Sequence, residues 1–400
     1  MDVFSKRRCP YCGHVVMLGE LPIVATNRVK RRPVGNAGGQ QVFAPAVNVP
    51  VYDVIRSWPV VVEAPLNAGA ERLHHRVLQK ALPPALPLLG DVDPALVPRR
   101  LCHRCATPMP EDIDSYPIYT IAVVGTSGAG KSHYLTSALR EAVYRQGLEH
   151  CDFAEFTFDN DSGNRFDNDY FIPVFRQRFL LAPTPEGTDV ARNPLVCKVA
   201  VGRNDPALVL FHDVAGEDLA DPRRRASTAG FVRRADATIF LIDPLSLDRP
   251  DGRPWPVEGA VDTAYANQAN LLNACMEELD HAHRRRTPIA IALSKSDLVA
   301  KALGRPVAFS APADMSSLAA WRKDAERIDQ EVQQVLREFG GNDVVAAGRR
   351  RPPDLVSFHA VAAIGDTPNA DTIDVLKPVR CLDPLLMVLL RLPEISGRPG

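Results

Sequence analysis

The chain has 400 residues, of which 46% are hydrophobic and 24% charged, and its formal net charge is -1. This length favours two folding units, and the composition is typical of globular proteins. The near-zero net charge excludes a general attraction to nucleic acid or acidic lipid. Any such binding would depend on a local patch, and Lys30, Arg31 and Arg32 are the local support for binding nucleic acid.

Targeting signals are not evident in the sequence. Lys6, Arg7 and Arg8 are not followed by an apolar segment, which argues against a secretory signal. The apolar run at 385–390 is far shorter than the roughly 20 residues that a membrane helix needs. We therefore expect a cytoplasmic protein without a membrane-spanning helix, in which the cysteines are thiols or metal ligands rather than disulfides.

Two Cys-x-x-Cys pairs mark the N-terminal region: Cys9 with Cys12, and Cys102 with Cys105. Two residues between thiolates allow one tight turn to direct both sulfurs to a tetrahedral zinc ion, and four thiolates complete a closed structural site. Redox-active thiols or two unrelated surface pairs are the alternatives. The other cysteines lack this spacing and are expected to be buried apolar residues: Cys151, Cys197, Cys275 and Cys381.

The long separation between the two pairs must contain an inserted small domain or an extended hairpin. Its regular candidates are strand-like runs at 47–52 and 60–62 and one helix at 70–82, and several prolines interrupt the rest. Residues 1–117 are therefore predicted to form a small, irregular, β-rich zinc-binding module. His14 and His103 are alternative zinc ligands beside the cysteines.

From residue 118 onward the pattern changes to buried strands alternating with amphipathic helices. This alternation predicts an α/β fold over 118–400, with a mostly parallel sheet that carries helices on both faces. The strands are expected at 119–124, 195–201, 207–212, 237–242, 288–293 and 355–362, and the helices at 132–144, 264–283, 317–339 and 384–392. The turn at 202–206 predicts a hairpin and hence one antiparallel strand.

A phosphate-binding loop follows the first of these strands. The sequence G-x-x-x-x-G-K-S lies directly between an apolar strand and a helix, which is the context that the motif requires. Lys131 would neutralise charge on the β- and γ-phosphates, and Ser132 would ligate Mg²⁺. The predicted nucleotide contacts in this segment are Gly125, Thr126, Ser127, Gly128, Ala129, Gly130, Lys131, Ser132 and His133. The alternative is a glycine-rich turn that only joins a strand to a helix.

Two further motifs follow later strands. Asp213 and Gly216 form D-x-x-G at the end of an apolar strand, where the carboxylate can hold Mg²⁺ and the glycine amide can meet the γ-phosphate. Lys295 and Asp297 form K-x-D after another buried strand. A carboxylate at Asp297 can accept the N1 and N2 protons of guanine, whereas adenine would present it with an acceptor. The alternative for this second motif is an exposed Lys and Asp that cap the next helix.

With these motifs in place, residues 118–395 resemble the Ras-like P-loop GTPases of the TRAFAC class. The chain looks closest to the bacterial double-GTPase families, which carry D-x-x-G-E, occur in multi-gene conflict or signalling operons and often begin with a zinc ribbon. The resemblance implies a GTP- and Mg²⁺-dependent switch. It assigns the P-loop to Gly125, Gly130, Lys131 and Ser132, switch II to Asp213 and Gly216, and the guanine site to Lys295 and Asp297.

Three positions depart from the family pattern or are ambiguous. Ser294 stands where the family usually has Asn or Thr, so one side-chain contact to the P-loop is weakened. Ala363 would offer the amide that contacts the guanine oxygen, but the serine that usually precedes it is missing. The switch I threonine that should reach Mg²⁺ is Thr184 or Thr188, with Thr188 preferred because it lies nearer the following strand.

Catalysis is predicted to involve Lys131, Gly216 and Glu217. Glu217 stands where Ras-like proteins use glutamine to orient water, and its charge would repel the γ-phosphate unless a cation offsets it. We therefore expect slow intrinsic hydrolysis. The basic run at 223–225 could provide the offset, although such runs usually form a solvated face.

The leading functional prediction is a GTP-hydrolysing switch that binds guanine nucleotide with Mg²⁺ and Zn²⁺ as cofactors. A protein effector or a second GTPase is the expected partner. An ATP-driven remodeller is one alternative, in which Lys295 and Asp297 do not read a base. A zinc-ribbon protein that binds nucleic acid, with a regulatory nucleotide site, is another.

Overall fold

The computed structural model describes most of the chain from residue 112 onward and shorter segments before it. The described residues are 6–11, 13–17, 21, 23–27, 33–37, 40–43, 96–100, 102, 104, 107, 109–110, 112–144, 148–182, 194–215, 230–255, 268–282, 284, 286–369 and 371–396. The chain divides into two compact units: Met1–Ile118 with Asp159–Asn168, and Tyr119–Phe158 with Asp169–Gly400.

The first unit contains three two-stranded antiparallel sheets. Its strands are β1 (Lys6–Arg8), β2 (Val15–Met17), β3 (Ile23–Asn27), β4 (Pro33–Ala37), β5 (Gln40–Phe43) and β6 (Leu96–Arg100), and it also holds the helix α4 (Asn160–Phe166). A small buried cluster includes Cys9, Val16 and Cys102. The strands predicted at 47–52 and 60–62 and the helix predicted at 70–82 lie outside the described residues.

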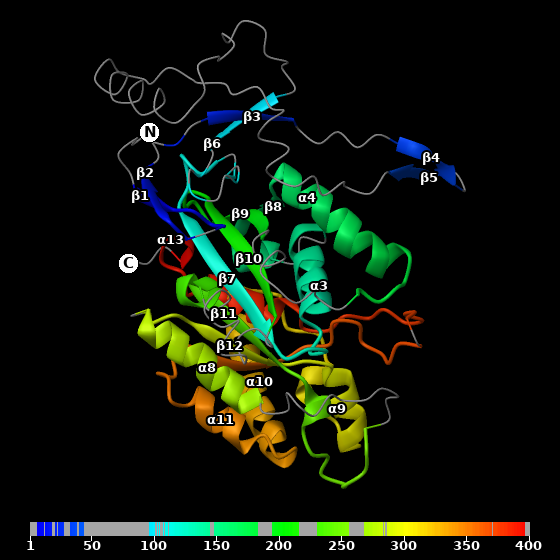
Figure 1. The fold of residues 1–400 in the computed structure, drawn as a ribbon. Helices are drawn as coiled ribbons and strands as arrows, with labels where there is room; N and C mark the ends of the chain where they lie inside the picture. The colour runs from blue at the N-terminus through cyan, green and yellow to red at the C-terminus, as the bar shows by residue number, and fades with distance from the viewer. Residues whose placement is uncertain are drawn as a thin grey trace, which may run out of the picture. The chain divides into compact units, whose positions relative to one another are not determined.

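The second unit is built on a seven-stranded sheet in the order β13-β12-β11-β7-β10-β9-β8 (Figure 1). In chain order the strands are β7 (Ile118–Gly125), β8 (Phe153–Phe158), β9 (Leu195–Val201), β10 (Ala207–Ala215), β11 (Ala237–Ile242), β12 (Ile289–Leu293) and β13 (Val356–Ala360). β11 pairs in parallel with both β7 and β12, and β12 with β13. β9 is antiparallel to β10, as the hairpin at 202–206 predicts, and it is also antiparallel to β8.

All six predicted strands are therefore present, and the α/β fold is confirmed. The central strands are apolar along their whole length because both of their faces are covered, and every residue of β11 and β12 is buried. The strand β8 at the edge of the sheet was not predicted.

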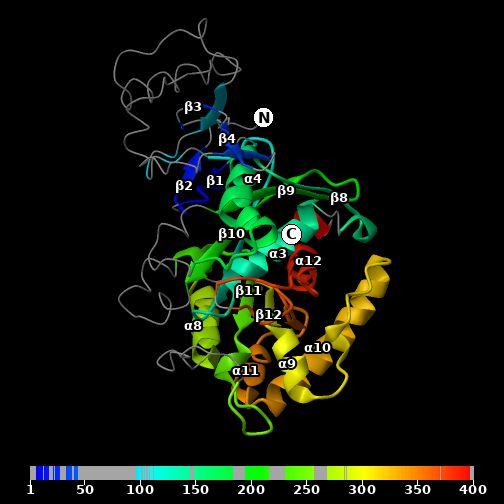
Figure 2. The same ribbon diagram turned by 90° about the vertical axis from the view of Figure 1, so that its right-hand side faces the viewer.

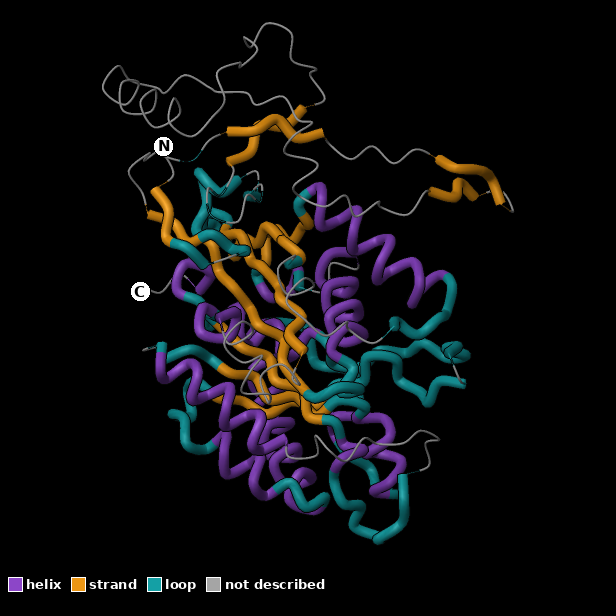
Figure 3. Tube along the Cα trace, in the orientation of Figure 1, coloured by secondary structure: helices purple, strands orange, loops and turns teal. Residues whose placement is uncertain are grey.

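Helices cover both faces of the sheet, as Figures 2 and 3 show. On one face α8 (Gln268–His281), α10 (Leu318–Glu338) and α11 (Asn342–Gly348) share a core cluster with the strands. Phe240 and Ile242 of β11 belong to this cluster, whereas the buried Leu241 between them does not, as the alternation of side chains in a strand requires. On the other face α3 (Lys131–Tyr144) packs against α12 (Leu382–Leu389), which contacts β11 and β12.

The predicted helices correspond to α3, α8, α10 and α12, although 256–267 in front of α8 lie outside the described residues. Shorter elements were not predicted. They are η3 (Glu149–Cys151), the π-helix η4 (Asp167–Arg176), η5 (Pro244–Ser246), α9 (Ser296–Leu303), η7 (Ala308–Ser310), α11 and α13 (Pro393–Ser396). None of the helices in the described part of the chain has the length and apolar character to cross a membrane.

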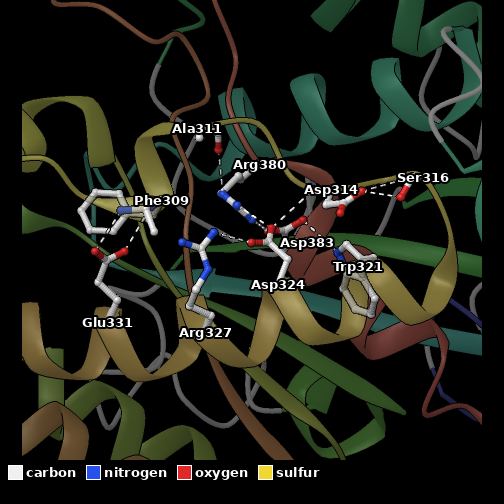
Figure 4. A network of polar contacts seen from close by, with 11 residues as sticks. Phe309, Ala311, Asp314, Ser316, Trp321, Asp324, Arg327, Glu331, Arg380 and Asp383 are labelled. Carbon is white, nitrogen blue, oxygen red and sulfur yellow. Dashed lines mark hydrogen bonds and ion pairs between the residues drawn. The ribbon is translucent and has the colours of Figure 1, made fainter.

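A buried polar network joins α10 to the start of α12 (Figure 4). Arg380 has a positive φ of 57° and donates to Ala311 O at 2.9 Å, to Asp383 Oδ2 at 2.8 Å and to Asp324 Oδ2 at 2.6 Å. Asp383 also accepts a hydrogen bond from Trp321 Nε1 at 3.0 Å. Burial raises the pKa of the Asp383 carboxyl, and the adjacent Arg380 opposes that rise. The network therefore depends on charge compensation inside the protein.

Candidate nucleotide-binding site

The predicted phosphate loop connects β7 to α3 in a conformation that depends on its glycines. Gly128 and Gly130 have φ angles of 72° and 82°, which an L-residue with a side chain rarely adopts. A Cβ atom on Gly125 would lie 2.8 Å from the carbonyl oxygen of Leu241 in the neighbouring strand β11. The loop thus requires the absence of side chains both for its turn and for its close contact with the sheet.

Lys131, the first residue of α3, folds back onto this loop. Its Nζ donates to the carbonyl oxygens of Gly125 and Thr126, each at 3.0 Å, and the residue is only 6% exposed. The ammonium group is therefore held against the loop whose amides are predicted to bind phosphate. A lysine buried in this way needs a negative partner to neutralise its charge fully, which suits phosphate.

The next residue connects the loop to the predicted D-x-x-G motif. Ser132 Oγ donates to Asp213 Oδ2 at 2.6 Å, and Asp213 lies near the end of β10, directly beside β7 in the sheet. A hydroxyl and a carboxylate in contact are the oxygen donors that Mg²⁺ prefers. The residues present therefore fit a magnesium site.

The remaining switch residues fall outside the described part of the chain. They are Thr184, Thr188, Gly216, Glu217 and the basic run at 223–225. Their roles in switch I, switch II and hydrolysis remain predictions.

The K-x-D motif follows β12 on the other side of the loop. Ser294 Oγ donates to the carbonyl oxygen of Ile242 at 2.9 Å, so it braces the end of β11. Lys295 has a positive φ of 47°, and its Nζ lies 3.0 and 2.9 Å from the two carboxylate oxygens of Asp243. The lysine is therefore fixed by a bidentate ion pair.

Asp243 is a site residue that the sequence did not reveal. It follows β11 directly, is 7% exposed, and its Oδ2 lies 3.8 Å from the position of a Cβ on Gly128. The buried Gln268 accepts a hydrogen bond from Asp243 N at 2.6 Å and donates to Asp243 O at 3.0 Å. The carboxylate is thus held between the phosphate loop and Lys295. The signal available in the sequence was a polar residue directly after the apolar run that forms β11.

Asp297 lies in the first turn of α9. Burial raises the pKa of its carboxyl, while main-chain amides at the helix start and Lys301 act in the opposite direction and Asp366 adds to the rise. Lys295 and Asp297 are both half-buried, which differs from the exposed pair that the helix-capping alternative assumes. A partly desolvated carboxylate is suited to accepting N–H groups of a planar base.

Ala363 is brought to the same end of the sheet. Ser137 Oγ, on the second turn of α3, donates to the Ala363 carbonyl oxygen at 2.7 Å. The main chain of Ser296 also donates to the Val361 carbonyl oxygen at 3.1 Å. The predicted base loop is therefore tied to both the helix of the phosphate loop and the K-x-D segment.

His133 lies beside this group in a neutral state. Its Nε2 accepts a hydrogen bond from Leu181 N at 3.1 Å. Burial lowers the pKa of His133 to about 4, and the charge of Lys295 contributes to the shift. The imidazole therefore carries no charge near neutral pH.

The predicted zinc site is only partly described. Cys9 and Cys102 are 1% and 0% exposed and belong to one buried cluster. Gly13 has a φ of 72° and donates its N–H to the Cys9 carbonyl oxygen at 2.8 Å, forming the turn expected of a zinc knuckle. Among the described residues no group of three or more His, Cys, Asp and Glu side chains could hold a metal, and Cys12, His103 and Cys105 lie outside them. The described residues therefore leave the zinc site a prediction.

The four cysteines without this spacing are buried, as predicted: Cys151, Cys197, Cys275 and Cys381. Burial raises the pKa of Cys151 to about 11 and of Cys275 to about 12. These two thiols are therefore protonated in the folded protein.

Comparison with known proteins identifies the family. The model of the Double-GTPase 2 family matches residues 119–345, more than half of the chain. The chain belongs to the Double-GTPase 2 family. The match includes the phosphate loop, Asp213 and the K-x-D motif, so this double-GTPase is a Ras-like P-loop protein, as its motifs predict.

Other similarities of this double-GTPase are more distant. It is 23% identical over 309 residues to a protein of Mycolicibacterium smegmatis named putative ESX-1 scaffolding and assembly protein SaeC, covering 72% of this chain and 78% of that protein. The signal recognition particle receptor SRb-GTP/SRX complex from Chaetomium thermophilum is 19% identical, with a TM-score of 0.29 and coverage of 63% and 94%. A variant of Aquifex aeolicus Era bound to GDP.AlF4- is 13% identical, with a TM-score of 0.28 and coverage of 69% and 57%.

Proposed function

We propose that this protein binds GTP with Mg²⁺, hydrolyses it slowly and acts as a nucleotide-controlled switch on a protein partner. Two pairs of side chains, one on each side of the phosphate loop, support the proposal most directly. Ser132 meets Asp213 at 2.6 Å, and Lys295 meets Asp243 at 2.9 Å. One pair suits the metal and phosphates, and the other suits the base.

Each residue has a distinct role in this proposal. The amides of 125–130 and the ammonium of Lys131 would hold the phosphates, and Ser132, Asp213 and Thr188 would hold the metal ion. Mg²⁺ would supply a Lewis acid that neutralises phosphate charge. Asp297 would accept guanine N–H groups while Lys295 lies along the base plane, and Ala363 would contact the guanine oxygen.

Slow hydrolysis is expected because Glu217 would carry a negative charge close to the γ-phosphate. Gly216 would contact the same phosphate and report its loss. A protein effector or a second GTPase would read the change. The name of the Mycolicibacterium relative supports a protein partner in a multi-component bacterial system. Nucleic acid as a partner has little support beyond the basic residues at 30–32.

A competition experiment tests guanine selectivity. A fluorescent GDP analogue is bound to the full chain with Mg²⁺ and displaced by GTP, GDP or ATP, for wild type, Asp297→Ala and the control Asp205→Ala in an exposed turn. We expect GTP and GDP to compete at least about 100-fold better than ATP, a preference of about 2.7 kcal/mol. Asp297→Ala should abolish the preference and Asp205→Ala should retain it. Equal competition by ATP would favour the ATP-driven alternative.

A further inference from the structure

A recess lies in the second unit beside α3, where Ser137, Arg140 and Glu141 line it. It has a volume of about 630 Å³ and is bounded by α3, the end of η4, residues 312–315 and the segment 376–383. This volume is within the range of roughly 300–1,000 Å³ that small-ligand sites occupy. None of the residues that line it is among those assigned to the nucleotide.

Basic side chains outnumber acidic ones in this recess. Its basic residues are Arg140, Arg176, Arg178, Lys377 and Arg380, and its acidic residues are Glu141 and Asp383. Asp383 is already neutralised by Arg380 in the buried network of Figure 4. Glu141 remains as the one lining carboxylate against four basic side chains, and its distance from Arg140 is 3.9 Å. The recess therefore has an excess of positive charge.

Two of these cations have no acidic partner within the described part of the chain. Neither Arg178 nor Lys377 makes an ion pair with any carboxylate that the structure describes, and both are exposed. They reach the recess from segments about 200 residues apart. Like charges brought together without a counter-ion repel one another, and an anion bound between them would relieve this repulsion.

Aromatic rings orient the two other arginines. The guanidinium of Arg140 lies 4.1 Å from the centroid of Phe175, and that of Arg176 lies 5.7 Å from the centroid of Phe171. The two rings stack at 5.6 Å with an interplanar angle of 20°. Stacking on a ring fixes the plane of a guanidinium, and the N–H edge of such a plane matches phosphate oxygens in a bidentate manner.

The main chain fixes the segments that carry Arg178 and Lys377. The Arg178 carbonyl oxygen accepts a hydrogen bond from Ile373 N at 2.8 Å, and Leu180 N donates to Asp371 O at the same distance. Lys377 N donates to the Ile364 carbonyl oxygen at 2.6 Å. The cations are therefore carried by a paired backbone rather than by separate loops, which lowers the cost of ordering them around a ligand.

We propose that this recess binds a small anion that carries two or more phosphate groups. Several separate cations suit several phosphate groups better than one carboxylate, and Arg140 and Arg176 offer planar edges for them. The excess of positive charge in the recess is matched better by an anion than by an apolar ligand. The proposal does not depend on GTP binding at the phosphate loop.

Calorimetry with inorganic pyrophosphate tests this site directly. The full chain is first saturated with GDP and Mg²⁺ to block the phosphate loop, and a Lys131→Ala chain is titrated in parallel so that binding at that loop is recognised. We expect one equivalent of pyrophosphate to bind to both chains. Arg178→Ala combined with Lys377→Ala should lower the affinity at least tenfold, whereas Arg203→Ala in the exposed β9–β10 turn should change it less than twofold.

Unchanged affinity in the double variant, or binding that Lys131→Ala alone removes, would overturn the proposal. Absence of pyrophosphate binding would also overturn the proposal. Binding of a polyglutamate peptide in its place would show that the recess takes carboxylates rather than phosphates. Equal thermal unfolding midpoints would show that the double variant folds, and Arg176→Ala provides a second test. Vesicles of phosphatidylcholine with and without diphosphatidylglycerol identify the source of the phosphate: sedimentation that the double variant loses assigns a lipid headgroup, and pyrophosphate binding alone assigns a soluble ligand.

Discussion

At the scale of single residues, Asp243 compensates for the departure at Ser294. The serine hydroxyl bonds to the end of β11, whereas the Asp243 carboxylate lies between Gly128 and the Lys295 ammonium, which pairs with both carboxylate oxygens. We therefore infer that Asp243 takes over part of the bracing between the base motif and the phosphate loop. It acts through Lys295, so it is a positioning residue.

Replacing Asp243 with Asn should weaken nucleotide binding. The amide keeps the shape of the side chain but removes the charge that fixes Lys295, and we expect about a tenfold loss of affinity, or about 1.4 kcal/mol. The loss should be equal for GTP and GDP because Lys295 is proposed to contact the base rather than the γ-phosphate. Displacement of a fluorescent nucleotide measures both. Asp248→Asn, at an exposed position five residues later, is the control, and an unequal loss would contradict the positioning role.

His133 should make stability depend on pH. The folded protein binds a proton on His133 only near pH 4, whereas an unfolded histidine binds one near its ordinary value of 6.5. Between these values the unfolded state holds more protons, so stability falls as the pH falls through this window. The loss is at most about 3 kcal/mol.

Urea unfolding at pH 7, 6, 5 and 4 measures this dependence across the window between the two pKa values. His133→Gln keeps an acceptor for Leu181 N and should lose less stability than wild type on acidification. Other groups, such as the buried His359 with a pKa lowered to about 3, are common to both proteins and cancel in the difference. Parallel pH curves for the two proteins would argue against a neutral, buried His133.

At the scale of elements, the network of Figure 4 explains how a long polar helix is attached. Glu331 of α10 accepts hydrogen bonds from Ala308 N and Phe309 N at 2.9 and 3.1 Å, so the helix holds η7. Asp324, two turns earlier, holds Arg380 at the start of α12. The carboxylates of one helix therefore position two segments that are distant in sequence.

Two arginines on Asp324 provide a matched comparison of buried and exposed ion pairs. Arg380 and Arg327 each lie 2.6 Å from this carboxylate, but their side chains are 1% and 60% exposed. Arg380→Met should lower the free energy of unfolding by about 3–5 kcal/mol because it leaves Asp383 buried without a counter-charge. Arg327→Met should cost less than about 1 kcal/mol. Chemical denaturation separates the two cases, and similar losses would show that burial does not decide the strength of this pair.

The same scale shows which elements a sequence can reveal. The six strands and the long helices were predictable because their apolar patterns are local and extend over one or more turns or pleats. β8, α9 and α11 were not predicted because they are short and their patterns fit more than one structure. Asp243 and the basic recess were missed for another reason. Their contacts join residues from 52 to about 200 positions apart, and only the folded chain brings these together.

At the scale of the whole molecule, the two units differ in how they are stabilised. The sheet of the second unit has an extended core, whereas the described buried cluster of the first unit contains six residues. A structural zinc ion held by four cysteines contributes folding energy directly to the module that contains it. The proposed zinc ion would provide this support.

Metal analysis of the purified full chain should find about one zinc ion per chain. Cys102→Ser should lose the zinc and expose the first unit to proteolysis, because a serine hydroxyl is a much poorer zinc ligand than a thiolate. Cys275→Ser is the control, since Cys275 is buried in the other unit. Full zinc retention in Cys102→Ser would exclude this cysteine as a ligand.

The hydrogen bond between Ser137 and Ala363 has a consequence for the proposed switch. The helix that begins at the phosphate loop is fastened to the loop expected to contact the base, so these two contact regions form one stiff frame. A frame of this kind would hold the base and the first two phosphates identically before and after hydrolysis. The presence or absence of the γ-phosphate would then have to change the conformation of another part of the chain. Different residues would therefore bind the nucleotide and signal its state.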